Sequence, residues 1–236
     1  MTGVMKNSFR YAFRRSIPIL IGFFPVGVAY GILMADAGYH FLWSFFASLV
    51  IYAGSLQMLM VSFFTGALPL VTVALTALLL NSRHIFYGLS FIEKFKSYGK
   101  WRWLLIYGLT DEAYSLLCSY EEREGVEEKW VHIFSSVLCW CYWIGFSVLG
   151  ALIGQALTFD TTGVDFALTA LFIVILVEQL KGAETKIPCA AALVSALGCL
   201  VLLGPDKFLL PSLCLTVASL VLLRPVIEAK SGKEAA

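Results

Sequence analysis

Long apolar stretches separated by short polar segments run along most of this chain. Uncharged runs cover residues 17–35, 41–80, 133–159, 187–205 and 208–223, with shorter ones at 103–110 and 166–177. A helix needs about 20 apolar residues to cross the hydrocarbon core of a bilayer, so the run at 41–80 is long enough for about two passages. The pattern predicts an all-α polytopic membrane protein with about eight hydrophobic elements.

Composition agrees with a chain that uses the lipid bilayer as its solvent. Of its 236 residues, 59% are hydrophobic and only 14% are charged, and the mean hydropathy is +0.83. Soluble globular domains contain about 25% charged residues. The net charge is only +1, and no basic face with interleaved aromatic residues indicates a nucleic-acid partner.

The polar ends of the chain predict its domain limits. Residues 1–16 carry four cations among aromatic residues, which is typical of an amphipathic lead-in at a membrane surface. Residues 17–224 then form a single transmembrane transport domain, and 225–236 form a disordered tail. Positive charge favours the cytoplasmic side, so we expect both termini to be cytoplasmic and the protein to lie in the cytoplasmic (inner) membrane.

Residues 41–65 fit two topologies. They either cross the membrane once or dip in and return at Gly54-Ser55. The basic loop after residue 92 should be cytoplasmic, and it is so only if 41–65 is re-entrant. That version places the acidic segment 121–129 outside, and it needs a second dip at 163–180.

A weak internal repeat relates two parts of the chain, residues 17–92 and 130–205. In each, a glycine-containing helix leads to an apolar stretch ending in glutamine, Gln57 or Gln179, and then to a proline. With re-entrant or broken helices near 41–65 and 163–180, these would be two inverted three-element repeats, as in many transporters. With eight plain spans they would be parallel, and chance similarity is a third explanation.

The first long apolar run contains a proline and two closely spaced glycines. Gly27 and Gly31 form a GxxxG face that favours close helix packing. Alternatively, Pro25 and Gly27 loosen the backbone beside a binding cavity, as broken helices do in transporters.

Charged residues interrupt the apolar pattern at two places, Arg83-His84 and Asp111-Glu112. If both segments are helical, each pair lies about 15 Å from the basic loop between them, which is about half the depth of the hydrocarbon core. The two pairs should therefore meet, because a bare charge at that depth is costly. They either lock two helices together or form a site that handles charge; a histidine that titrates near neutrality favours the second.

Such a site has the groups that an amino acid zwitterion requires. Arg83, or free N–H groups near Gly54-Ser55, would bind its carboxylate. Asp111 and Glu112 would bind its ammonium group, and His84 would carry a coupling proton. The amides of Gln57 and Asn81 either orient the ligand or join helices. Glu178-Gln179 would be the counterpart of Gln57 in the second repeat, although Glu178 is equally compatible with an interfacial position.

Two other functional classes have weaker support. Ser55, His84 and Asp111 could be imagined as the triad of an intramembrane enzyme, but Ser55 lacks a G-x-S-x-G context. A non-transporting or channel-like scaffold subunit is the other alternative. The six cysteines lie in or beside apolar runs, and Cys139-Trp140-Cys141 lacks further nearby ligands, so we expect neither a metal nor a cofactor.

Four short motifs in order resemble one known family. PVGVAYG at 25–31, YAGSLQ at 52–57, NSRH at 81–84 with FYG at 86–88, and TDE at 110–112 are similar to the AzlC family, the large subunits of branched-chain amino acid exporters also called BrnF or YgaZ. The resemblance implies export of leucine, isoleucine, valine or methionine together with a small AzlD/BrnE-type membrane subunit. Together with the intramembrane charges it predicts proton-coupled antiport. Ser55 and Met58 occupy variable positions, which leaves substrate preference open.

Overall fold

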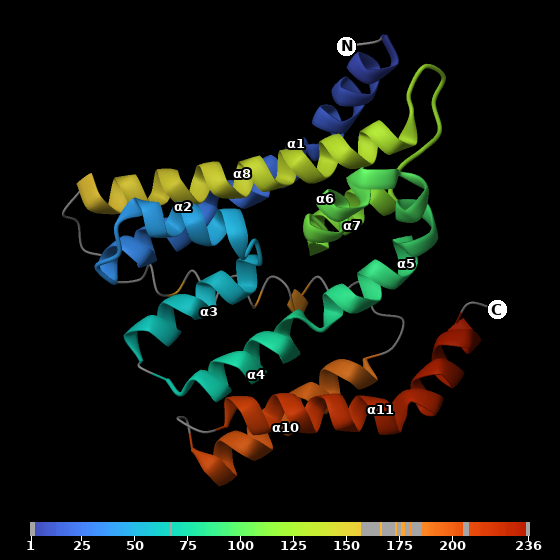
Figure 1. Cartoon of the computed structure of the whole chain (residues 1–236). Coiled ribbons are helices and arrows are strands. Elements are labelled where there is room, and N and C mark those ends of the chain that lie inside the picture. Colours follow the sequence, from blue (N-terminus) through green and yellow to red (C-terminus); the bar gives the residue numbers. More distant parts are fainter. Residues whose placement is uncertain are drawn as a thin grey trace. The chain divides into compact units, whose positions relative to one another are not determined.

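The computed structural model describes residues 3–66, 68–156, 166, 173, 176–177, 180, 186–204 and 208–234, and in these ranges all regular structure is helical (Figure 1). The helices are α1 Gly3–Asp36, α2 Phe41–Val50, α3 Gly54–Thr65, α4 Leu70–Asn81, α5 Arg83–Ser97, the 3-10 turn η1 Gly99–Trp101, α6 Arg102–Tyr107, α7 Asp111–Cys118, α8 Glu128–Ala156, α10 Ile187–Leu203 and α11 Leu209–Glu234. The predicted dip at 163–180 lies largely outside the described residues.

Contacts divide the chain into two compact units, where the sequence predicted one domain. The first contains residues 1–67 and 81–168, and the second contains 68–80 and 169–236. In the second unit α10 packs against α11. Helix α11 continues through Pro225 to Glu234, so the predicted disordered tail is helical over most of its length. Similarly, the predicted surface lead-in is the first part of α1.

Within the described ranges, two helices are long and apolar enough to cross a membrane. They are α1, with 34 residues, and α8, with 29. The pair α4 and α5 would be a third if it acts as one bent span. By contrast, α2 and α3 have 10 and 12 residues and are about 15 and 18 Å long, too short to cross individually.

Helices α1 and α8 pack side by side along much of their lengths (Figure 1). A Cβ atom placed on Gly31 would lie 2.2 Å from the Ser147 carbonyl oxygen, and one on Gly150 would lie 2.1 Å from that of Val28. Only glycine permits this approach, so the predicted close packing at the GxxxG face is confirmed.

The direction of α8 argues against the inverted form of the predicted repeat. Ser16 of α1 hydrogen-bonds Tyr142 of α8 at 3.0 Å, and Gly154 lies against Ile32, so the two helices run parallel. Helices α1 and α8 are the first elements of the two predicted repeats. The orientation of α1 and α8 is therefore opposite to that expected for inverted halves.

Residues 41–65 adopt the hairpin alternative. Tyr39, just before α2, packs against Phe64 near the end of α3 with ring centroids 5.0 Å apart. The chain reverses at residues 51–53, the tip of the first hairpin, where Trp140 of α8 donates a hydrogen bond to the Ser48 carbonyl at 3.3 Å. Residues 41–65 thus enter and leave the bundle at the same end of α8.

A second hairpin, formed by α6 and α7, enters from the other end of α8. The Trp101 ring lies 5.9 Å from that of Trp130, the Tyr107 ring 5.6 Å from that of Trp140, and the Tyr120 ring 6.0 Å from that of His132. The chain therefore runs inward along α8 and then returns. Its tip is at residues 108–110, where Thr110 caps the amino terminus of α7.

This second hairpin corrects the predicted placement of the acidic segment. Asn7 donates a hydrogen bond to the Gly125 carbonyl at 3.4 Å, and Ser8 accepts one from the Glu127 amide at 3.0 Å. The acidic segment therefore lies beside the amino terminus of α1 instead of across the membrane from it. The physical reason is the helix break at 108–110, which leaves two helices too short to cross.

Candidate binding site at the hairpin tips

Three helices begin at one place in the first unit. Arg83 is the first residue of α5, Asp111 the first of α7 and Ser55 the second of α3. One guanidinium nitrogen of Arg83 lies 3.0 Å from an Asp111 carboxylate oxygen, and the other terminal nitrogen donates to Ser55 Oγ at 3.1 Å. The spacing predicted that Arg83 would lie level with the acidic pair, and the structure shows its contact with one member of that pair, Asp111.

The ion pair lies near the middle of α8. Gly54 lies directly against the indole of Trp143, because a Cβ atom added to Gly54 would be only 3.2 Å from that ring. Trp143 in turn lies about 22 Å along α8 from Glu128, the first residue of the helix. Lys94 binds Glu128 at 2.6 Å, and α5 carries the chain about 16 Å from Lys94 back to Arg83. If α8 spans the membrane, the site lies close to its midplane.

The electrostatics of the site combine two charges with three helix dipoles. A helix amino terminus has unpaired N–H groups and the equivalent of about half a positive charge. Ala53, which precedes α3, provides no side-chain cap. The termini of α3 and α5 and the Arg83 guanidinium favour an anion, and the Asp111 carboxylate can bind a cation, so the arrangement suits a ligand that carries both charges.

Several polar side-chain atoms at the site have no hydrogen-bond partner within the described part of the chain. They are Arg83 Nε, Asp111 Oδ1, the Asn81 carbonyl oxygen and the Tyr52 hydroxyl, all shielded from solvent. Buried polar atoms of native proteins are nearly always hydrogen-bonded. Other parts of the Arg83 and Asp111 side chains are exposed, 26% and 35% respectively.

Gln57 bonds the first tip to its surroundings through its side-chain hydrogen bonds. Its side chain is fully buried; its carbonyl oxygen accepts from the Ala53 amide at 3.3 Å and the Trp143 indole at 2.9 Å, and its nitrogen donates to Ser48 Oγ at 3.0 Å. Of the two predicted roles of Gln57, the structure therefore favours joining helices. The network surrounds Tyr52, whose φ of 44° is rare for a residue with a side chain.

The remaining predicted residues occupy different positions. Gly27 lies against Phe146 of α8, and Pro25 lies within the continuous helix α1, so helix packing accounts for Gly27 here. His84 is half-buried beside Tyr87, with ring centroids 5.8 Å apart, and Glu112 directly follows Asp111. Glu178-Gln179 lies outside the described residues.

Aromatic residues of α6 and α8 also shape the site, and the sequence reasoning missed them. The Trp140 and Trp143 indoles donate hydrogen bonds to residues of the first hairpin. The Tyr107 hydroxyl donates one to the Leu49 carbonyl and so joins the second tip to the first. Tyrosine and tryptophan usually concentrate at membrane interfaces. Their occurrence in the middle of an apolar run was the available signal, because buried indole and phenol groups seek polar partners.

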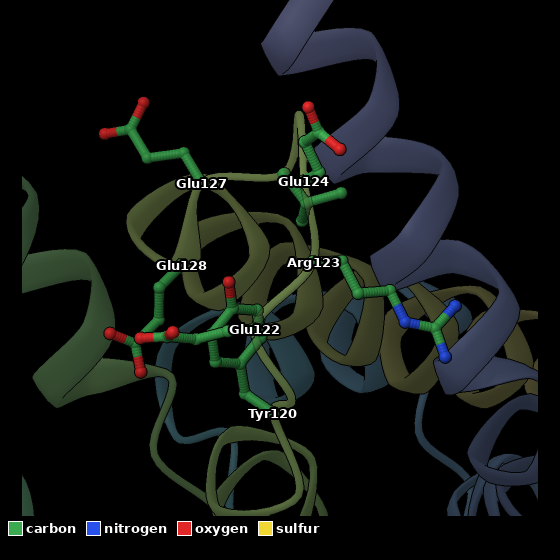
Figure 2. Close-up of a pocket in the computed structure, with 7 residues that line it drawn as sticks. Tyr120, Glu122, Arg123, Glu124, Glu127 and Glu128 are labelled. Atoms are coloured by element: carbon green, nitrogen blue, oxygen red, sulfur yellow. The ribbon is translucent and has the colours of Figure 1, made fainter.

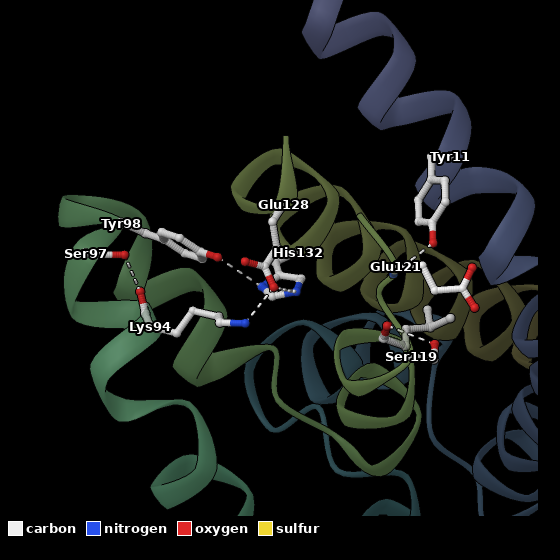
Figure 3. Close-up of polar contacts among 9 residues, drawn as sticks. Tyr11, Lys94, Ser97, Tyr98, Ser119, Glu121, Glu128 and His132 are labelled. Carbon is white, nitrogen blue, oxygen red and sulfur yellow. Dashed lines mark hydrogen bonds and ion pairs between the residues drawn. The ribbon is translucent and has the colours of Figure 1, made fainter. Parts of the chain in front are cut away.

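A second polar cluster lies at the start of α8 (Figure 3). Glu128 binds Lys94 at 2.6 Å, and its carboxylate lies 3.6 Å from the fully buried His132, which also contacts the Tyr98 hydroxyl at 3.3 Å. These contacts join α5 to α8 at the end farthest from the first hairpin. Across the described residues, no three His, Cys, Asp or Glu side chains are grouped to hold a metal ion.

These features define a polytopic α-helical membrane protein in which opposed hairpins hold a charged site. The family model described as AzlC protein matches residues 18–157. The chain therefore belongs to the AzlC family, whose transport function supports a non-enzymatic role. No solved structure matches the chain.

Relatives match over most of their lengths. A branched-chain amino acid transport protein, AzlC of Bacillus subtilis, is 33% identical over 94% of this chain and 87% of its own. An uncharacterised membrane protein of Helicobacter pylori is 38% identical over 94% and 97%, respectively. The inner membrane protein YgaZ of Escherichia coli is 30% identical over 77% of both chains.

Proposed function

We propose that this protein is the large subunit of a secondary transporter that exports branched-chain amino acids across the cytoplasmic membrane. The observation that carries the proposal is the contact of Arg83 with both Asp111 and Ser55 where three helices begin. The relative named a branched-chain amino acid transport protein supports the choice of substrate class.

The substrate would lie between the two charges of the site. Arg83 and the amino terminus of α3 bind its carboxylate, because both present N–H donors and positive potential. Asp111 binds the ammonium group through the oxygen that has no protein partner. When substrate enters, part of the Arg83–Asp111 ion pair is replaced by two charge-assisted contacts with the substrate. These new contacts offset the free energy needed to remove water from the charged groups of the protein and the substrate.

The hairpins supply a route to this site. Each enters from a different end of α8, and their tips meet where the Tyr52 and Tyr107 rings lie 6.0 Å apart. Non-helical backbone at membrane depth is tolerated where it is buried in protein or lines a cavity. Movement of one hairpin against the other would open the site to one side at a time, which is the requirement for alternating access.

Proton coupling would use groups beside the substrate. Asp111, Glu112 and His84 are ionisable and lie within the segments that begin at the site, and intramembrane ionisable residues commonly form proton relays. A proton that enters the site would compete with the ammonium group and favour its release. A small AzlD/BrnE-type membrane subunit would complete the transporter, with this chain's amino terminus on the cytoplasmic side.

Transport by proteoliposomes that contain this chain and such a small subunit tests the proposal. We expect a proton gradient to drive leucine movement, and Arg83→Gln to reduce it at least tenfold, because the loss of one charge-assisted contact costs about 1.5–3 kcal/mol. Arg102→Gln, which removes an exposed cation outside the site, is the matched control and should change the rate less than twofold.

Substrate analogues assign the two ends of the ligand. Leucinamide lacks the carboxylate and 4-methylpentanoate lacks the ammonium group, so we expect both to compete poorly with leucine for the wild-type protein. Arg83→Gln should reduce the preference for leucine over leucinamide, and Asp111→Asn the preference for leucine over 4-methylpentanoate. Unchanged preferences in both variants would place substrate elsewhere, and full transport by Arg83→Gln would favour the scaffold alternative.

A further inference from the structure

Two cavities border the segment that joins α7 to α8. One, of about 520 Å³, is lined mainly by carboxylates, including Glu122, Glu127 and Glu128. The other, of about 270 Å³, lies against α1 and is lined by Asn7, Arg10, Tyr11, Arg14, Arg15, Arg123, Glu124 and Val126. Figure 2 shows that Arg123 extends toward α1, whereas Glu122 and Glu128 turn to the other side.

Four guanidinium groups and one carboxylate line the smaller cavity. Arg10 and Arg14 have no ion-pair partner among the described residues, and they lie one turn apart on the same face of α1. Among the described residues, the one ion pair of Arg123 is a long one, 3.8 Å from Glu121. Four cations against one carboxylate give the lining a net positive charge, so the cavity favours an anionic ligand.

The cavity has a defined shape because its walls are connected. Arg15 donates a hydrogen bond to the Ser119 carbonyl at 2.7 Å, and the Tyr11 hydroxyl accepts one from the Glu121 amide at 3.3 Å. The Arg123 guanidinium lies over the Tyr11 ring, 5.3 Å from its centroid. These contacts fix the segment between α7 and α8 against α1. As a result, arginines of α1 and of that segment line the same cavity.

The position of the cavity along α1 indicates the source of the anion. The uncharged part of α1 begins at residue 17, so Arg14 is within about 5 Å of it and Arg10 within about 11 Å. That is the headgroup zone if α1 crosses the membrane, and basic pockets at this level bind anionic lipid headgroups. Arginine suits phosphate because its planar donors bind two oxygens at once.

We propose that the cavity lined by Arg10, Arg14, Arg15 and Arg123 binds the phosphate headgroup of an anionic phospholipid. The bound headgroup would fasten the segment between α7 and α8 to α1. Because that segment ends the second hairpin, lipid binding would stabilise the hairpin in its place. This cavity is separate from the proposed substrate site. Lipid binding to it can be measured without a transport assay.

Native mass spectrometry of the full chain in detergent tests this site. With phosphatidylglycerol and phosphatidylcholine of equal chain length, we expect retention of phosphatidylglycerol to be roughly tenfold stronger. The double variant R10Q/R14Q should lose about 25-fold in phosphatidylglycerol affinity, because each arginine near a headgroup contributes about a factor of five. R10K/R14K keeps the charges and should retain most of the binding.

The matched control is K96Q/K100Q, which removes two charges from the same end of the molecule but outside the cavity; it should change affinity less than twofold. Single variants R10Q and R14Q replace the double variant if it does not fold. Equal retention of the two lipids, or equal loss in the control, would overturn the proposal. Displacement of lipid by inorganic phosphate at matched concentration would assign the cavity to a soluble phosphate compound and would also overturn it.

Discussion

The two hairpins reach the same point of the molecule with different chemistry. The first, α2 and α3, contains no charged residue and is fixed by the neutral amide of Gln57. The second, α6 and α7, contains Asp111 and Glu112 directly after its tip. Their tips touch through Tyr52 and Tyr107.

This difference indicates that the polar groups of the first tip stabilise the fold, whereas those of the second tip can bind a ligand. At the first tip the buried side-chain amide is bonded to Ser48, Ala53 and Trp143, so it stabilises one conformation. At the second tip, Asp111 keeps one oxygen without a protein partner. We infer that the first hairpin provides a rigid wall and the second provides the ion-binding group.

The largest expected effect concerns the sides from which the hairpins enter. In membrane vesicles of a cysteine-free background, Ser97→Cys and Glu124→Cys should react with an impermeant thiol reagent from the same side, and His40→Cys only from the opposite side. The reason is that both ends of the second hairpin lie at the start of α8, whereas the first begins near its end. Reaction of Glu124→Cys from the side of His40→Cys would mean that residues 102–118 cross the membrane.

Removal of the amide at the first tip should cause the largest loss of stability. Gln57→Leu leaves the Ala53 amide, the Trp143 indole and Ser48 Oγ without their partner, and we expect a loss of about 3 kcal/mol in the free energy of unfolding. Denaturant unfolding in detergent measures it. Gln155→Leu, which removes an exposed amide, is the control and should cost less than about 0.5 kcal/mol; equal losses would contradict the proposed role of Gln57.

The charge at the second tip should contribute less, because it is partly exposed. A double-mutant cycle of Arg83→Gln and Asp111→Asn should give a coupling energy of about 1–2 kcal/mol. The pair Lys96–Glu93 is 61% and 86% exposed, and its cycle should give below about 0.5 kcal/mol. If both cycles give the same small value, Arg83 and Asp111 are not coupled in the folded protein.

Loss of the contact between the two tips should have the smallest effect on the free energy of unfolding. Tyr107 and Tyr52 provide a matched pair of variants to test this. Tyr107→Phe removes a hydroxyl that donates to the Leu49 carbonyl, so we expect a loss of about 1 kcal/mol. Tyr52→Phe removes a hydroxyl that makes no hydrogen bond of good geometry within the described residues and should cost less than Tyr107→Phe in the same unfolding assay. A larger loss in Tyr52→Phe would show that its hydroxyl makes the cross-tip contact.

Helix breaks were predictable only where the local residues marked them. Gly54-Ser55 and the need to keep a basic loop cytoplasmic indicated the first hairpin. The second hairpin was not predicted, because Thr110-Asp111-Glu112 also fits an interruption within a crossing segment. Thr110, a capping residue before two acids, is in fact a typical helix start. Residues 102–118 are also too few to cross with a break in the middle.

Partners of buried polar groups were harder to predict than their positions. Spacing from the basic loop placed Arg83 level with the acidic pair, because helical rise converts sequence distance into depth. It did not show that Gln57 would bind Trp143, since side chains on separate helices meet only through packing. Gly27 and Gly31 had two possible roles, and the close approach of α8 decides between them for these glycines.

By itself, the sequence determined that this is a helical membrane protein with charged residues inside its apolar segments, because hydrophobicity and charge are local properties. Tertiary structure decided that α1 and α8 run parallel, that residues 102–118 return, and that Arg83 contacts Ser55 as well as Asp111. These features depend on which surfaces pack together. That choice is made by the free energy of the whole bundle and by no single segment.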